Sequence, residues 1–209
     1  MNCPFCEEMA TGLLPAEYDS GIGSRVVTDT THFVVVVDIS PLAPGHVLII
    51  PRAHILSFGA TKQEHREELT SLVRKVKKAI TEFYAPPVIM EHGSSPSSDG
   101  GACISHAHLQ VFPGNIDIRE ALSRFRVVRI SSFWELAKWA SEGKPYLYYE
   151  NQAGDMLVAD DIEKIEKQFI RIEISKRIGL LDPNWDWRRH SNRKDLIKTI
   201  ETLKKFSGW

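Results

Sequence analysis

The chain has 209 residues, of which 43% are hydrophobic and 25% charged, and it carries a net charge of −1. This balance is typical of a globular protein with a sizeable core, and the lack of a positive field argues against nucleic acid or an anionic membrane as a partner. The longest apolar runs are far too short to cross a bilayer, and we expect no secretory signal at the N-terminus.

The first motif is the pair Cys3-x-x-Cys6, and the chain has one further cysteine, Cys103. The pair alone has three interpretations: half of a zinc site, a redox pair, or chance. Structural zinc is usually four-coordinate, so half a zinc site needs two more ligands. Three cysteines in this arrangement do not form a disulfide framework, and we therefore expect a reducing cytoplasm.

Short runs of β-branched and aromatic residues predict strands. Residues 33–37, Phe-Val-Val-Val-Val, are apolar throughout and predict a strand that is buried on both faces. Residues 12–24 are rich in Gly, Pro and Ser and predict a loop. Strands are expected at residues 25–28, 31–39, 46–50, 88–91, 104–112, 146–150 and 156–158.

The clearest helix follows residue 60. Thr61 and Glu64 form a capping box, and apolar residues recur at helical spacing over residues 69–83. Pro86-Pro87 ends this helix. Further helices are expected at residues 118–125, at 133–140, at 160–178 behind the cap Asp160-x-x-Glu163 with a stop at Gly179, and behind the cap Asn192-x-x-Asp195.

The stretch 103–113, Cys-Ile-Ser-His-Ala-His-Leu-Gln-Val-Phe-Pro, organises the rest of the chain. It predicts a strand that stops at Pro113, and side chains alternate between the two faces of a strand. His106, His108 and Gln110 therefore share one face, while the apolar residues between them share the other. Two imidazoles and a carboxamide in a row have little use in a core and are suited to binding phosphate.

Three other features have both a local and a functional interpretation. The loop at residues 93–101 can bring backbone N–H groups to a phosphate, but a mobile hairpin connection is at least as well supported. Asp38 follows a strand and can make a local turn bond or bind a ligand. A basic cluster near the C-terminus could meet a phosphate, although the solvated end of a helix is the favoured interpretation; it comprises Arg188, Arg189, His190 and Arg193.

His106-x-His108-x-Gln110 resembles the signature of the histidine triad (HIT) superfamily. The similarity is to the branch in which glutamine replaces the third histidine, as in galactose-1-phosphate uridylyltransferases and some dinucleoside-polyphosphate phosphorylases. It covers the first half of the chain in detail. Further matching segments are residues 38–54, similar to the first strand pair of the family; Cys3-Pro-Phe-Cys6, similar to the zinc half-site of its metal-bearing members; and Glu91-His92-Gly93 with Gly100-Gly101, similar to its glycine-rich approach to the triad strand.

The resemblance implies an α+β fold, with a HIT-type antiparallel sheet, flanking helices and a C-terminal α/β extension. Residues 1–114 would form the nucleotide-binding catalytic core, and residues 115–209 would form the extension that packs on it. The family also implies a homodimer and a nucleotide or nucleotidyl conjugate as substrate.

The resemblance also assigns roles to single residues. His108 would attack the α-phosphorus and form a covalent nucleotidyl-histidine, and Gln110 would donate a hydrogen bond to a non-bridging phosphate oxygen. In the family this exchange goes with transfer to phosphate or a sugar phosphate more than with hydrolysis. Asp38 would bind the ribose hydroxyls, and His46 would line the same pocket. The expected catalytic residues are thus His108, Gln110 and His106, and the expected substrate-binding residues are Asp38, His46, Gly101 and Cys103.

In similar proteins a structural zinc joins the cysteine pair to two histidines, which here are His54 and His106. The expected Zn²⁺ ligands are therefore Cys3, Cys6, His54 and His106, a set that leaves no open coordination position. One departure concerns Cys103, since many small family members have Ser or Thr at this position to contact the leaving group. We expect a buried thiol there, and a thiol is a weak donor.

The leading hypothesis is nucleotidyl transfer or nucleotide hydrolysis through His108. One alternative is a non-catalytic module that binds nucleotide or zinc. Another is uridylyl transfer between sugar phosphates, which predicts a preference for uridine. The base, the leaving group and the acceptor remain open at the level of sequence.

Overall fold

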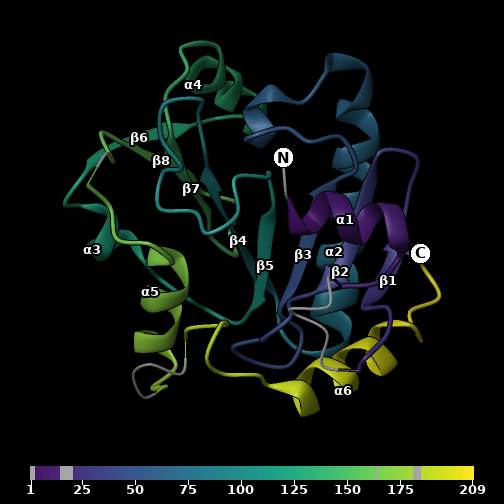
Figure 1. Ribbon diagram of the computed structural model, residues 1–209. Helices are drawn as coiled ribbons and strands as arrows, with labels where there is room; N and C mark the ends of the chain where they lie inside the picture. The colour runs from purple at the N-terminus through teal and green to yellow at the C-terminus, as the bar shows by residue number, and fades with distance from the viewer. Residues whose placement is uncertain (1–2, 15–20, 163, 181–184) are drawn as a thin grey trace.

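Eight antiparallel strands form one sheet in the computed structural model, which describes residues 3–14, 21–162, 164–180 and 185–209 (Figure 1). Within these residues the strand order is β1-β2-β3-β5-β4-β7-β8-β6. The strands are β1 (Val26–Asp29), β2 (Phe33–Val37), β3 (Val47–Pro51), β4 (Pro87–Gly93), β5 (Leu109–Pro113), β6 (Arg126–Ile130), β7 (Tyr146–Glu150) and β8 (Met156–Asp160).

Helices flank the sheet, which confirms the predicted α+β class. The α-helices are α1 (Pro4–Thr11), α2 (Arg66–Phe83), α3 (Arg119–Leu122), α4 (Ala137–Ser141), α5 (Phe169–Arg177) and α6 (Arg193–Leu203). Short 3-10 helices are η1 (Phe58–Ala60), η2 (Gln63–His65) and η3 (Phe133–Leu136). Across the described ranges, no helix is both long enough and apolar enough to pass through a membrane.

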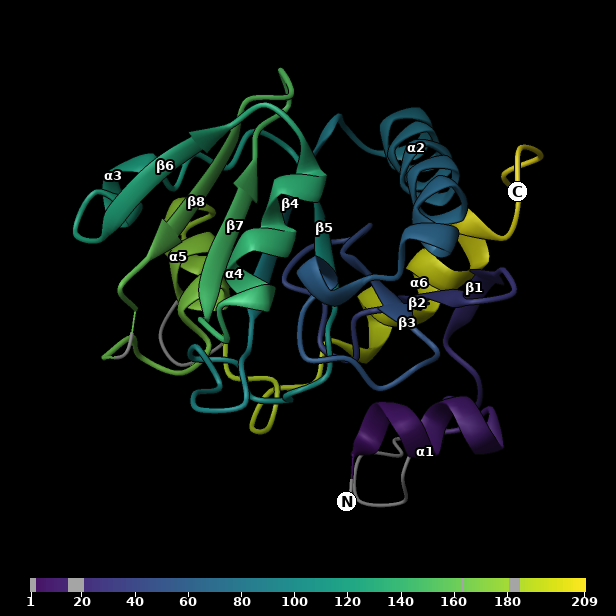
Figure 2. The ribbon, with the colours of Figure 1, turned by 90° about the horizontal axis from the view of Figure 1, so that it is seen from above.

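The two faces of the sheet carry separate hydrophobic clusters because successive strand residues point in opposite directions. Val35 and Val37 of β2 pack with α2 and α6 on one face, whereas Val34 and Val36 pack with α1 on the other. Further along the second face, β4 and β7 pack with α5. Figure 1 shows α1 and α5 in front of the sheet on either side of β5, and Figure 2 shows α1 and α2 on opposite sides of it.

Strand β4 joins the two halves of the chain into one sheet. It pairs with β5 on one edge and with β7 on the other, and all seven of its residues are buried. Strands formed before and after residue 114 are therefore joined by backbone hydrogen bonds into the same sheet.

Most strands lie within two residues of their predicted bounds, but the central strand begins later than expected. We predicted it at residues 104–112, whereas β5 begins at Leu109. The chain before it turns through Gly100 and Gly101, both with positive φ, and the N–H of Ala107 bonds to the carbonyl of Ile55 outside the sheet. Helix α1 and the edge strand β6 were not predicted.

The predicted helix caps are wrong in detail. Helix α2 begins at Arg66 behind η2, and the hydroxyl of Thr61 has no partner among the described residues. Asp160 ends β8 and accepts bonds from Arg126 and Trp139, so it caps no helix. Glu163 lies outside the described residues, and α5 begins only at Phe169.

The final helix was predicted behind Asn192, and α6 does begin at the next residue. The Asn192 side chain, however, makes no bond to the helix. It donates instead to the carbonyl of Pro41, at 2.8 Å, because the loop before β3 lies against it.

A buried carboxyl group ties η1 to the centre of the sheet. Glu91 of β4 is fully buried and accepts hydrogen bonds from the N–H of Phe58 and the hydroxyl of Tyr146, both at 2.7 Å. Burial raises the pKa of Glu91 to about 7, although both hydrogen bonds oppose the rise. The folded protein therefore binds this proton more tightly than the unfolded chain does.

We expect this proton to make stability depend on pH. An unperturbed glutamate has a pKa of 4.5, so the contribution of protonated Glu91 is complete below pH 4.5 and is lost as the pH rises through about 7. The free energy of unfolding of the wild type, relative to that of Glu91→Gln, should fall by up to about 3 kcal/mol across this range. Urea unfolding of both proteins at several pH values measures the difference, and parallel pH profiles would contradict the assignment.

Candidate active site

His108 lies directly before β5 with one ring nitrogen fixed by the backbone. Its Nδ1–H donates to the carbonyl of His106 at 2.8 Å, which leaves Nε2 as the nitrogen available to a substrate. Burial lowers the pKa of His108 below its ordinary value, and the charges of Arg25 and Arg171 lower it further. The ring is therefore a neutral imidazole with a defined tautomer.

Gln110 and His46 lie on the same side of the sheet as His108. His46 is fully buried, its Nδ1 accepts a bond of 3.4 Å from the N–H of Leu42, and burial lowers its pKa to about 4. Among the described residues, Nε2 of His46 and Oε1 of Gln110 have no hydrogen-bond partner. The Gln110 side chain nevertheless raises the pKa of His46, so the two side chains are close neighbours.

Asp38 follows β2 and is held from two directions. Its Oδ1 accepts the N–H of Ser40 at 2.8 Å and Nη1 of Arg171 at 3.1 Å. Burial alone would raise the pKa of Asp38, but the charges of Arg171 and His46 lower it to about 2. The local turn bond anticipated from the sequence is thus present together with a long-range ion pair.

A small cavity, partly open to solvent, lies over β5 between α1 and α5. It unites Asp38, Gly101, Cys103, His108 and Gln110 of the predicted site. The other predicted substrate residue, His46, lies behind Asp38, with 3.9 Å between its Nε2 and Oδ2 of Asp38. Residues from outside the predicted site also line the cavity: Phe5, Glu8 and Arg25 from the N-terminal part, and Gln168, Arg171 and Trp187 from the C-terminal part.

The glycine-rich loop is tied to α5 through His92. Nδ1 of His92 donates to the carbonyl of Gly100 at 2.9 Å, and its Nε2 accepts the N–H of Ile170 at 3.2 Å. Gly101 has a φ of +80°, and a Cβ atom there would lie 2.7 Å from the side chain of Ile165. Both the backbone conformation and the close approach of the segment before α5 therefore require glycine at this position.

Cys103 is not the buried thiol that we expected. Its side chain is partly exposed, and its Sγ accepts a hydrogen bond from Nη2 of Arg188 at 3.1 Å. The thiol lines a second, wider groove that adjoins the first cavity and also contains Lys167, Trp187 and Arg188. The predicted basic cluster therefore has one member beside the site.

The four predicted zinc ligands lie together. Their ligand atoms are all within 4.8 Å of one another, and Nδ1 of His106 is 3.3 Å from Sγ of Cys3 and 3.6 Å from Sγ of Cys6. A tetrahedral zinc with bonds of about 2.0–2.3 Å separates its ligand atoms by roughly 3.3–3.8 Å, so small side-chain rotations complete such a site. Nε2 of His106 donates to the carbonyl of Pro51 at 2.8 Å, which directs Nδ1 towards the thiols.

The four potential metal ligands and the candidate nucleophile lie side by side, although both histidines precede β5 rather than belonging to it. The ring of Phe5 from α1 packs edge-on against both histidines, with centroid distances of 5.7 Å to His106 and 5.4 Å to His108. Both ring nitrogens of His106 face groups other than the cavity. This histidine therefore contacts the reaction site through its carbonyl, which orients His108.

Comparison with known proteins agrees with these motifs. A family model described as the HIT domain matches residues 20–116. Just under half of the chain thus matches the HIT domain. The C-terminal part of the chain, residues 117–209, lies outside the matched region.

Relatives and solved structures share the HIT domain at low identity. Protein hit of Bacillus subtilis is 26% identical over 112 residues, covering 54% of this chain and 70% of the relative. The adenosine 5'-monophosphoramidase hnt1 of Schizosaccharomyces pombe is 27% identical over 114 residues, covering 54% and 74%. The asymmetrical bis(5'-nucleosyl)-tetraphosphatase of the same organism is 27% identical over 92 residues, covering 44% and 50%. A hypothetical histidine triad nucleotide-binding protein of Sulfolobus tokodaii aligns over 99% of this chain and 97% of its own, with 17% identity and a TM-score of 0.41.

A buried ion pair in the wall of the HIT-domain cavity escaped the sequence analysis. Nε and Nη2 of Arg25 donate to the two carboxylate oxygens of Glu8, at 2.8 and 2.7 Å, and Nη1 donates to the carbonyl of Val37 at 2.6 Å. Each side chain is 2% exposed. The pair attaches α1 to the sheet beside His108, and no local pattern in the sequence reveals a pairing across 17 positions.

We expect the two members of this pair to be strongly coupled. Arg25→Met leaves a buried carboxylate without a partner and should lower the free energy of unfolding by about 3–5 kcal/mol. The double variant Glu8→Met/Arg25→Met buries no charge and should lose much less than Arg25→Met alone. Denaturant unfolding of the single and double variants completes the cycle, and additive losses would show that the pair is not coupled.

Proposed function

We propose that the protein acts at the α-phosphate of a nucleoside polyphosphate or nucleotidyl conjugate, with His108 as the nucleophile. The observation that supports this most strongly is the bond from Nδ1 of His108 to the carbonyl of His106. It fixes the tautomer whose free Nε2 can attack phosphorus, in a cavity that also contains Gln110 and Asp38.

The reaction proceeds by two displacements. In the first, Nε2 of His108 forms a bond to the α-phosphorus while the bond from phosphorus to the leaving group breaks, which yields a nucleotidyl-histidine. In the second, an acceptor oxygen attacks the same phosphorus and the bond to Nε2 breaks. The amide N–H of Gln110 donates to a non-bridging oxygen as negative charge develops on it. The backbone of Gly101, which lines the same cavity, offers a further contact to the phosphate.

Cations in the groove beside the cavity support an anionic substrate. At His108 itself the charges oppose one another, because Asp38 raises the pKa of the ring while Arg25 and Arg171 lower it. The adjoining groove carries Lys167 and Arg188 beside Cys103, on the side where a leaving group would depart. This arrangement supports a polyphosphate or another phosphorylated leaving group. Two relatives with nucleotide-directed names, a tetraphosphatase and a monophosphoramidase, also support a nucleotide substrate.

Gln110 favours transfer over hydrolysis. A carboxamide can donate a hydrogen bond to a phosphate oxygen, but it does not take up or release a proton near neutral pH. It is therefore poorly suited to activating water. We therefore expect phosphate or a phosphorylated metabolite as the acceptor. Uridylyl transfer to a sugar phosphate is a special case of this chemistry, and hydrolysis is the competing outcome.

We further propose that Cys3, Cys6, His54 and His106 hold a structural zinc ion. With four protein ligands the ion would supply no open position for chemistry, and its role would be to fix α1 and His106.

We also propose a cytoplasmic homodimer, as the family resemblance implies. Strand β7 already covers the outer edge of β4, which leaves β1 and β6 as the sheet edges within the described residues.

The covalent intermediate is directly testable. We expect intact-mass measurement after mixing with a dinucleoside polyphosphate to show one nucleotidyl adduct, which disappears when phosphate is added. His108→Ala should form no adduct and lose turnover by roughly 10³-fold or more, because it lacks the nucleophile. Its circular dichroism spectrum serves as the control for folding. Rapid turnover by folded His108→Ala would refute the mechanism, and fast hydrolysis without phosphate dependence would assign a hydrolase.

The zinc site makes a separate prediction. Protein purified without a metal-affinity tag should contain about one zinc ion per chain, and Cys3→Ser/Cys6→Ser should contain none. Because the binding free energy of a structural metal contributes to folding, chelation should lower the melting temperature of the wild type. The matched control is Cys103→Ser, which removes the third cysteine and should keep the zinc. Metal-free wild type, or zinc retained by the double variant, would overturn the assignment.

A further inference from the structure

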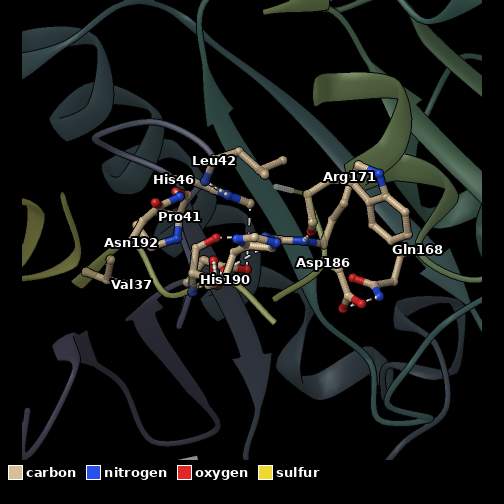
Figure 3. Close-up of polar contacts among 12 residues, drawn as sticks. Val37, Pro41, Leu42, His46, Gln168, Arg171, Asp186, His190 and Asn192 are labelled. Carbon is tan, nitrogen blue, oxygen red and sulfur yellow. Dashed lines mark hydrogen bonds and ion pairs between the residues drawn. The ribbon is translucent and has the colours of Figure 1, made fainter. Parts of the chain in front are cut away.

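The loop at residues 38–45, which leads from β2 to β3, is anchored by the C-terminal part of the chain. This loop carries Asp38 and lies beside the cavity. Figure 3 shows the network of contacts around it. Arg171 donates to Asp38 and to the carbonyl of Ser40, and Oγ of Ser40 donates to the carbonyl of His190. Nδ2 of Asn192 donates to the carbonyl of Pro41, and the N–H of Gly45 donates to Oγ1 of Thr199.

Arg171 is the centre of this network. Its side chain is 6% exposed and donates through all three of its nitrogens: Nη1 to Asp38 at 3.1 Å, Nη2 to the carbonyl of Ser40 at 2.7 Å, and Nε to the carbonyl of Trp185 at 2.8 Å. These acceptors belong to three different residues, and the planar fork of a guanidinium bonds to all three at once. The side chain therefore fixes Asp38 relative to both the loop and α5.

The two carboxylate oxygens of Asp38 have different contacts. Oδ1 accepts two hydrogen bonds, from the N–H of Ser40 and from Arg171. Oδ2 accepts none from the described residues, and it lies 3.9 Å from Nε2 of His46. One oxygen of a buried, ionised carboxylate is thus held rigidly while the other remains available on a residue that lines the cavity.

We propose that Arg171 is a positioning residue for the sugar subsite: it holds Asp38 so that Oδ2 accepts hydrogen bonds from the ribose hydroxyls of the nucleotide. The C-terminal part of the chain, which lies beyond the matched HIT domain, then completes the nucleotide site rather than only covering it. This inference rests on the proposed function, because it requires a nucleotide in the cavity.

A purely structural role for Arg171 makes a different prediction. If the arginine only joined α5 to the loop, its removal would weaken the protein and affect all nucleotides alike. A positioning role instead affects only ligands whose ribose hydroxyls Asp38 binds. The ratio of two dissociation constants, measured with and without these hydroxyls, separates the two roles because general destabilisation cancels in it.

The test measures binding of the four ribonucleoside 5'-monophosphates and of their 2',3'-dideoxy analogues by titration calorimetry. For the tightest-binding base, the wild type should prefer the ribonucleotide by roughly 10-fold to 100-fold, the range for hydrogen bonds to a charged group. Arg171→Met should reduce this preference to about threefold or less, with little change in the affinity for the dideoxy analogue. Arg171→Lys keeps the charge but not the fork and should give an intermediate preference, and it replaces Arg171→Met if that variant does not fold.

The matched control is Arg126→Met. Arg126 also donates from Nε and Nη2 to a buried aspartate, Asp160, at 2.7 and 2.6 Å, but it does not line the cavity. This variant should lose stability and keep the wild-type preference for ribose.

Two results would overturn the inference alone: an unchanged ribose preference in folded Arg171 variants, or a wild type that forms the His108 adduct but binds both nucleotide series equally. Absence of any nucleotide binding, together with absence of the adduct, would overturn the proposed function itself and the positioning role with it.

Discussion

The site depends on one local constraint, the segment His106-Ala107-His108 directly before β5, in which a single residue separates two imidazoles. The four potential metal ligands and the candidate nucleophile therefore lie next to each other. The same backbone unit that separates them supplies the carbonyl of His106, which accepts the Nδ1–H of His108. Any rotation of the His106 peptide would therefore disturb the tautomer of His108, and the contacts of His106 with Pro51 and the thiols resist this rotation.

The C-terminal part of the chain forms the wall of the cavity that lies opposite α1. Strands β7 and β8 extend the sheet beyond β4, and the chain then packs on the second face of the sheet as α5. Helix α5 then starts beside the glycine-rich loop and contacts it through His92. The cavity walls thus come from α1 on one side and α5 on the other, and the relative position of these walls is fixed by a single sheet.

The sequence predicts which side chains lie together at the site better than it predicts the walls of the cavity. His106, His108 and Gln110 could be placed because alternation is local and the motif is short. The metal set was found in the same way, since His54 and His106 match positions of a known pattern. In contrast, the pairs Arg25–Glu8 and Arg171–Asp38 join segments that are 17 and 133 positions apart. No periodicity encodes such a pair, and each of these arginines resembles a solvent-exposed residue when it is read alone.

The missed elements have equally physical causes. Helix α1 has only eight residues and a weak apolar stripe, so it is stable through Phe5 and the pair with Arg25 rather than through its own propensity. Strand β6 is an edge strand with four exposed residues, and it therefore lacks the alternation that identifies a half-buried strand. Asn192 has the composition of a helix cap, but its Nδ2 donates to the carbonyl of Pro41, and in this orientation its side chain accepts no hydrogen bond from the helix.

The charged side chains in the cavity wall are paired with one another. Arg25 is neutralised by Glu8, and Arg171 by Asp38, so neither arginine provides a full uncompensated charge. Their partners are fixed by two or more hydrogen bonds, which leaves the four charges as oriented dipoles rather than mobile ions. Such dipoles stabilise developing negative charge without first having to release a bound counterion. The adjoining groove also contains cations, and these have partners as well, since Lys167 Nζ lies 3.2 Å from Oδ2 of Asp99 and Arg188 donates to Sγ of Cys103.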